Sequence, residues 1–115
     1  MKSSPTCKEQ SMGVIAKTRN ILSDPKKWNK KSLARTKQGD ICLARSEQAV
    51  KWCLIGAMDK VCGNNFEEWE TARDIISSFI DVQNLVEFND GRTTTHAKLM
   101  LVLDWATGVE AAGGL

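Results

Sequence analysis

The chain of 115 residues carries a formal net charge of +2, and 42% of its residues are hydrophobic and 26% are charged. This composition is typical of one small globular domain and excludes an intrinsically disordered chain. No apolar stretch approaches the ~20 residues that a membrane span requires. Met1–Pro5 is not followed by an apolar segment, and four cysteines in an aliphatic-rich chain do not indicate a disulfide scaffold. We therefore expect a cytoplasmic protein with free thiols and without a secretory signal.

The charges are unevenly distributed along the chain. Residues 1–60 hold 13 Lys and Arg against 5 Asp and Glu, whereas residues 61–115 hold 3 against 9. Such asymmetry can indicate a surface for nucleic acid or for a partner. It is also what two complementary halves of one domain show when they pack face to face, and we favour this second interpretation.

The first 31 residues predict a leader, a helix and a basic loop. Residues 1–7 show no periodic pattern, and residues 8–23 place Met12, Ile15 and Leu22 at helical spacing. The pair Asp24-Pro25 ends this helix, because a residue before proline is pushed out of the helical region. The loop that follows, residues 26–31, contains four lysines around one tryptophan.

The next segments predict a hairpin and then two helices. Residues 32–36 and 41–44 flank Gly39, which supplies the positive φ of a tight connection. A second helix is expected to begin after Ser46 as N-cap and to end at Gly63. Its apolar positions follow helical spacing: Val50, Cys53, Leu54, Ala57, Met58 and Val61. A third helix is expected over residues 66–80, capped by Asn64 or Asn65.

The last part of the chain predicts a connector and a final helix. Residues 81–92 contain Asn89-Asp90-Gly91, a sequence typical of a turn, and Thr95 is the expected N-cap of the helix beyond it. The predicted fold is mainly α, a four-helix small domain over residues 8–110 with a short β-hairpin between the first two helices. Residues 111–115 are expected to fray. The predicted core contains Val50, Cys53, Leu54, Ala57, Met58, Trp69, Ile76, Phe79, Leu99, Met100 and Leu103.

Several short motifs together resemble a known family of bacterial and phage-borne small proteins, a domain of unknown function numbered 6197. The resemblance covers residues 12–106 and rests on Trp28, Leu33-Ala34-Arg35, the run from Ala49 to Met58, Phe88-Asn89-Asp90, Gly91-Arg92-Thr93 and Leu103-Asp104-Trp105-Ala106. The chain departs from the family pattern at Lys30-Lys31-Ser32, where a glycine is usual, at two additional threonines after Arg92, and at Lys98, where an acidic residue is common. The resemblance implies no activity, because none is established for the family.

The reactive side chains do not form a strong catalytic or metal-binding pattern. The cysteines lack the paired spacing of structural zinc sites and the chain has one histidine, so we expect neither a metal nor a cofactor. Cys53 with His96 and either Asp90 or Asp104 contains the elements of a nucleophilic site. Because Cys53 lies within an apolar stripe, burial is expected to raise the pKa of its thiol, and an enzyme is the third hypothesis.

Two groups of residues are candidates for binding. The first is a basic surface of Lys26, Lys27, Trp28, Lys30, Lys31 and Arg35, with Lys37 as a further member. The second is a polar cluster of Asn89, Asp90, Arg92 and Thr93, which could hold an anion. The alternative for the cluster is structural, with Arg92 paired to Asp90 or Asp104. Trp52 could line a groove with Trp28 and Arg35, or it could pack at the core rim, as could Trp28.

The function predicted from the sequence is that of a small cytosolic module that binds another protein. A nucleic-acid-binding accessory protein is the alternative, because lysines around one aromatic side chain are typical of elements that follow phosphates. The sequence identifies neither the partner nor the oligomeric state.

Overall fold

The structure, a computed structural model, describes residues 13–81 and 84–113 and shows a mainly helical fold with a small sheet. The helices are α2 (Val14–Leu22), a 3-10 helix η1 (Pro25–Lys27), α3 (Leu54–Cys62), α4 (Phe66–Ser77), α5 (Leu85–Asp90) and α6 (His96–Ala111). The strands are β1 (Ala34–Thr36), β2 (Ile41–Cys42) and β3 (Ala49–Trp52). In the described ranges, no helix has the length and apolar character needed to cross a membrane.

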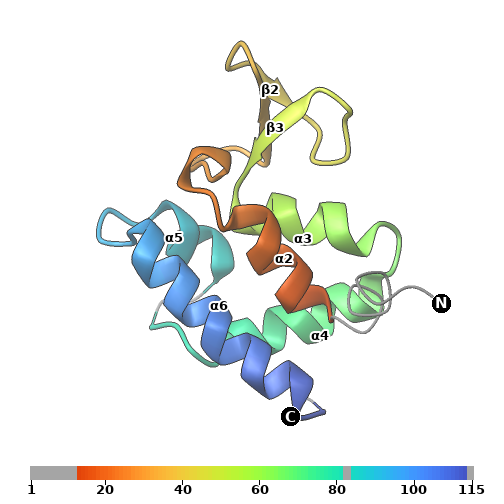
Figure 1. The fold of residues 1–115 in the computed structure, drawn as a ribbon, viewed down its shortest axis with the longest axis vertical. Coiled ribbons are helices and arrows are strands. Elements are labelled where there is room, and N and C mark those ends of the chain that lie inside the picture. Colours follow the sequence, from red (N-terminus) through yellow and green to blue (C-terminus); the bar gives the residue numbers. More distant parts are fainter. Residues whose placement is uncertain (1–12, 82–83, 114–115) are drawn as a thin grey trace, which may run out of the picture.

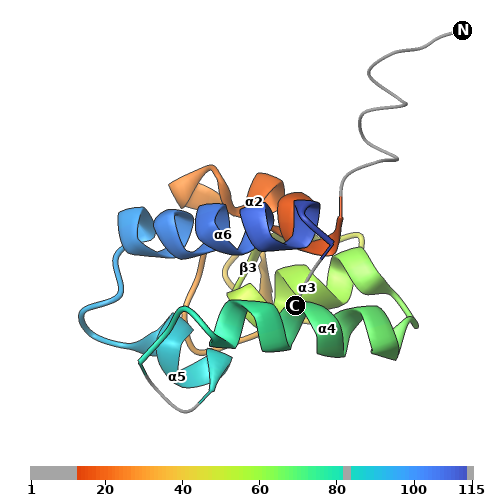
Figure 2. The same cartoon turned by 90° about the horizontal axis from the view of Figure 1, so that it is seen from below.

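The helices form two layers around the core. Figure 2 shows α2 and α6 side by side in one layer, with α3 and α4 in the other and α5 at one end. The three strands project from this body at the end where α3 begins (Figure 1). We call residues 33–52, which contain the three strands and their connections, the sheet arm.

Each α-helix contributes an apolar side to the core between the layers. Leu54 and Leu103 are fully buried, as are Ile15 and Ile76. The prediction that Cys53, Leu54, Ala57, Met58, Ile76, Leu99 and Leu103 are buried is confirmed. Trp69, Phe79 and Met100 are only partly buried and pack against the outside of this core.

The predicted hairpin forms, but it belongs to a three-stranded antiparallel sheet with the order β2-β1-β3. Ala34 pairs with Cys42 on one side and with Trp52 on the other. The Trp52 side chain is buried and its indole donates a hydrogen bond to the Ala44 carbonyl at 2.9 Å. Trp52 therefore packs in the core, which is the structural one of its two expected roles.

The prediction of a helix beginning after Ser46 is wrong. The Ser46 hydroxyl accepts a hydrogen bond from Gln48 N at 3.0 Å within a turn, and the next four residues form β3. The apolar residues of this strand happen to continue the helical spacing of α3. Pairing with β1 nevertheless makes the segment a strand, because tertiary contacts override a local pattern. Val50 is consequently 41% exposed instead of buried, and Cys53 lies at the start of the helix instead of in its middle.

The connector between the third and last predicted helices also differs from expectation. Asn84 caps a short helix, α5, and Asn89 and Asp90 form its last turn. The described residues therefore contain five α-helices instead of four. Other predicted boundaries are confirmed: Asn65 and Thr95 cap α4 and α6, and Gly63 ends α3 with a φ of 60°.

Gly56 explains how closely α3 approaches the sheet arm. A Cβ atom at this position would lie 2.0 Å from the Leu33 carbonyl oxygen. The backbone at Leu33 also accepts a hydrogen bond from Cys53 N at 3.2 Å. Only glycine permits this contact, which fixes the arm against the N-terminal turn of α3.

Candidate functional site

The two groups of polar residues predicted as binding candidates meet in space. The loop around Trp28 lies against the end of α5, and we call Trp28, Asn29, Lys30 and Lys31 with Asn89, Asp90 and Gly91 the polar junction. Its central residue is Asn89, whose side chain is 1% exposed. The Asn89 carboxamide oxygen accepts hydrogen bonds from the Trp28 indole at 2.7 Å and from Leu54 N at 2.9 Å. Its amide group donates to the Asn29 carbonyl at 3.1 Å, so this side chain joins three separate segments.

Lys30 and Lys31 of the loop are held by the same helix end. Asp90 accepts a hydrogen bond from the backbone N–H of Lys31 at 2.8 Å, and Lys31 has a φ of 73°, in the left-handed region. The Lys30 ammonium donates to the Gly91 carbonyl at 2.6 Å and lies over the Trp28 ring. The polar junction therefore ties the basic loop to α5.

Arg35 is also engaged within the protein. It donates to the Asn29 side chain at 3.0 Å and to the Gly39 carbonyl at 2.7 Å. Of the predicted basic surface, Lys26, Lys27 and Lys31 have exposed side chains that form no ion pair within the described residues. Lys30 and Arg35 are thus engaged within the protein and the Trp28 indole is already hydrogen-bonded, while Lys37, the further member, is exposed.

The remaining members of the predicted polar cluster lie outside the polar junction. Arg92 and Thr93 are exposed between α5 and α6. The expected pairing of Arg92 with Asp90 or Asp104 is absent among the described residues, because Asp90 binds the loop backbone and Asp104 pairs with Arg19. The cluster therefore divides into a structural half, in which Asn89 is buried and Asp90 is half-buried, and an exposed half.

Cys53 caps α3 and is buried near the polar junction. Its sulfur accepts a hydrogen bond from Gly56 N at 3.3 Å, and desolvation by burial raises the pKa of the thiol. A raised pKa keeps the thiol protonated at neutral pH, which disfavours a nucleophilic role. His96 instead contacts the Leu22 carbonyl at 2.7 Å and the Trp28 ring.

The described cysteines, Cys42, Cys53 and Cys62, are free thiols, as predicted, whereas Cys7 lies outside the described residues. The described part of the chain also contains no group of three or more side chains placed to hold a metal ion.

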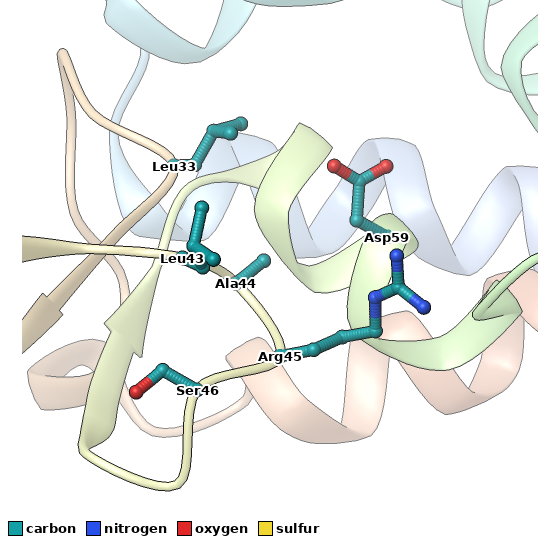
Figure 3. A pocket seen from close by; sticks show the side chains of 6 residues that line it. All are labelled: Leu33, Leu43, Ala44, Arg45, Ser46 and Asp59. Atoms are coloured by element: carbon teal, nitrogen blue, oxygen red, sulfur yellow. The ribbon is translucent and has the colours of Figure 1, made fainter.

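A pocket that the sequence did not predict lies where the sheet arm meets α3. It has a volume of about 380 Å³ and is lined by Leu33, Leu43, Ala44, Arg45, Ser46 and Asp59. Figure 3 shows the two leucines on the arm side and Asp59 projecting from α3, with the Arg45 side chain extending toward that helix. The pocket thus combines an apolar wall with one charge of each sign.

Asp59 is the half-buried acidic residue of this pocket. Desolvation by burial raises the pKa of its carboxyl, while the Trp69 indole and Arg45 act in the opposite direction. Asp59 also borders a neighbouring pocket of about 320 Å³, beside Phe66 and Trp69. Arg45 itself donates to the Asn64 side chain at 3.2 Å. The carboxylate forms no ion pair within the described residues, although the Trp69 indole and Arg45 lie near it.

The sheet arm carries the two most exposed of the large hydrophobic side chains in the described residues. Leu43 is 76% exposed and Ile41 is 69% exposed. They lie on the sheet face away from Ala34 and Trp52, together with Leu33, which faces Leu43 if the β1–β2 register is continued. This exposure could not be predicted from the sequence, because Ile41, Cys42, Leu43 and Ala44 are all apolar. Without a polar residue among them, alternation does not indicate which side faces solvent.

Comparison with known proteins yields a family but no described relative. No curated protein matches the chain significantly, and neither does any solved structure. Residues 8–109 match a family of unknown function, DUF6197. Since this match spans most of the chain, the protein belongs to the DUF6197 family of unknown function.

Proposed function

We propose that this chain is a small cytosolic module that binds another protein through its sheet arm. The observation that carries the proposal is the exposed apolar face of Leu33, Ile41 and Leu43, which adjoins the pocket containing Asp59. Exposed apolar side chains that cluster beside a pocket with a few polar groups are typical of interaction sites.

The contrast with the rest of the surface supports this choice. The donors and acceptors of the polar junction are mostly bonded within the protein, whereas the sheet arm leaves apolar area exposed beside the partly buried carboxylate of Asp59 on α3. A bound polypeptide could cover the leucines and offer a donor to Asp59. Both contacts would favour binding, because the free protein exposes apolar area to water and holds a partly desolvated carboxylate without an ion pair.

The test is a selection of peptides from a random displayed library on the purified protein, followed by calorimetry with each selected peptide. Leu43→Ser should weaken binding at least about tenfold, because it removes exposed apolar contact area. Leu101→Ser is the matched control, since Leu101 is 47% exposed on α6, away from the arm. Peptides that bind both variants equally, or a selection that enriches none, would reject the proposal.

Nucleic-acid binding is the second candidate, favoured by the exposed Lys26, Lys27 and Lys31. The Trp28 indole is bonded to Asn89, so we expect phosphate contacts without base stacking. Binding to bulk DNA and RNA should then be weak, independent of sequence and steeply dependent on salt.

The test of this candidate measures that salt dependence in the wild type and in Lys27→Glu. The substitution should reduce affinity for every nucleic acid alike and flatten the salt slope by roughly one. A wild-type protein that does not bind nucleic acid at moderate salt would reject the candidate.

A further inference from the structure

We infer that the partner of the sheet arm presents a lysine or arginine side chain that pairs with Asp59, and that apolar residues on both sides of this cation cover the two walls beside the carboxylate. This inference rests on the proposed function and names the chemistry of the partner for the same surface. Three observations carry it: the position of Asp59 between two pockets, the exposed apolar walls of those pockets, and the absence of an ion pair at this carboxylate within the described residues.

Asp59 lies where two pockets meet. It lines the pocket of about 380 Å³ between the sheet arm and α3, and also the pocket of about 320 Å³ between α3 and the start of α4. Leu33 and Leu43 form the apolar wall of the first pocket, as Figure 3 shows. Phe66 and Trp69 form the wall of the second. Because the pockets share Asp59, one bound segment can occupy both, with its middle at the carboxylate.

The apolar walls on the two sides of Asp59 are open to solvent. Leu43 is 76% exposed and Phe66 is 64% exposed. The rings of Phe66 and Trp69 stack, with centroids 6.1 Å apart and planes at 10° to each other, and so form a flat aromatic surface. A segment that places one apolar residue on each wall therefore removes apolar area from water on both sides of the carboxylate.

The carboxylate between these walls is complementary to a cation. Asp59 is half-buried, and desolvation raises the pKa of its carboxyl, so water solvates the ionised form incompletely in the free protein. A lysine or arginine side chain supplies the opposite charge together with hydrogen-bond donors. Glu67 and Glu68, in the first turn of α4, add negative charge close to the second pocket. Charge complementarity therefore favours a basic segment over a neutral or an acidic one.

Arg45 is the positively charged residue nearest to this arrangement, and it distinguishes a basic partner from an acidic one. Its exposed side chain donates to Asn64 and forms no ion pair with Asp59. A cation bound at Asp59 would be repelled by Arg45, whereas an acidic partner would pair with Arg45. We favour the cation because Asp59 is partly desolvated and gains more from a new ion pair than the solvated Arg45 does.

The first test begins with peptides selected on the purified protein from a displayed library of random nine-residue sequences. We expect the selected peptides to contain an arginine or a lysine between apolar residues. The tightest of them is then synthesised with its neutral counterpart, which has citrulline in place of arginine or acetyl-lysine in place of lysine. Calorimetry should show a dissociation constant at least about tenfold higher for the neutral peptide, because the charge-assisted hydrogen bonds are lost.

A carboxylate variant tests whether Asp59 is the group that the cation contacts. Asp59→Asn should raise the dissociation constant of the basic peptide at least about tenfold and should leave that of the neutral peptide nearly unchanged. Asp81→Asn is the matched control, since Asp81 is exposed beyond the opposite end of α4, and it should leave binding unchanged. Thermal unfolding checks that both variants are folded.

Two further variants test the surroundings of the carboxylate. Arg45→Gln should strengthen binding of the basic peptide several-fold, because it removes a like charge. Phe66→Ser should weaken binding several-fold, because it removes exposed apolar contact area from the second pocket. Leu101→Ser on α6 is again the control and should have no effect.

Selected peptides that bind through Leu43 but contain no cation would overturn the inference and leave the proposed function standing. A neutral counterpart that binds as tightly as the basic peptide would have the same meaning. Weaker binding in Arg45→Gln together with unchanged binding in Asp59→Asn would show that the partner is acidic, which also overturns the inference. A selection that enriches no peptide would reject the proposed function and the inference with it, so the two failures are distinguishable.

Discussion

The polar junction and the sheet arm use opposite kinds of residue for opposite purposes. The junction contains lysines, asparagines and a tryptophan, yet Asn89 at its centre is buried and bonds to two other segments, the loop around Trp28 and the start of α3. The arm contains leucine and isoleucine, yet these side chains lie in solvent beside a pocket. The polar junction therefore joins segments of the fold, whereas the apolar side chains of the sheet arm lie on the free surface.

This difference shows that residue type alone does not identify a binding surface. A polar side chain is available to a partner only if the fold has not already satisfied it, and an apolar side chain signals binding only if the fold leaves it uncovered. The predictions below test each half of this comparison.

The largest effect is expected at the centre of the polar junction. Asn89→Ala removes the acceptor of Leu54 N and of the Trp28 indole, and leaves these donors without a protein partner. We expect a loss of ~3–5 kcal/mol in the free energy of unfolding, because unsatisfied buried donors cost ~1–3 kcal/mol each. Urea denaturation measures it. Arg92→Ala, at an exposed position two residues past the end of α5, should change stability by less than ~0.5 kcal/mol. Equal effects would contradict the structural role of the junction.

Trp28→Phe tests whether the indole N–H of Trp28 contributes to stability. The ring remains but the N–H that bonds Asn89 is lost, so stability should fall by ~1–2 kcal/mol. Thermal unfolding detects this change. If Trp28 instead serves to stack on a base, Trp28→Phe should keep its melting temperature and most of its affinity for single-stranded nucleic acid, because a phenyl ring also stacks, whereas Trp28→Ala should lose ~1–3 kcal/mol of that affinity.

Asp59→Asn tests how the negative charge in the pocket between the sheet arm and α3 affects the free energy of unfolding. Because burial raises the pKa of this carboxyl, the folded state binds its proton more tightly than the unfolded state does. The stabilisation from the protonated form is complete below the ordinary pKa of 3.8 and is lost as pH rises through the raised pKa. The variant should therefore gain stability relative to the wild type at pH 7 but not at pH 3. The gain should stay below ~1 kcal/mol, because the group is partly solvated.

The smallest effect on stability is expected on the sheet arm. Leu43→Ser exchanges a mostly exposed side chain, so the free energy of unfolding should change by less than ~0.5 kcal/mol while association weakens. Leu54→Ala, at a fully buried position, is the matched control and should cost ~2–5 kcal/mol. A large loss of stability in Leu43→Ser would show that the arm is part of the core.

Local signals in the sequence determined most helix ends and much of the core. Asn65 and Thr95 cap helices because their side chains can satisfy free N–H groups of the first turn, a choice that depends on only a few neighbouring residues. Gly63 ends α3 because its positive φ is accessible to glycine at little cost. The apolar stripes of α3 and α6 likewise predicted buried residues such as Leu54 and Leu103.

Tertiary structure alone decided where the strand β3 forms and which candidate residues remain free. The spacing of Val50 fits a helix, but pairing with β1 provides hydrogen bonds that no local pattern reveals. Asn89 is 60 or more residues from the Trp28-Asn29 pair that it contacts, so its burial depends on how α5 packs against the loop. The uncovered face of Leu43 has the same origin, since exposure is a property of what packs against a residue and not of the residue itself.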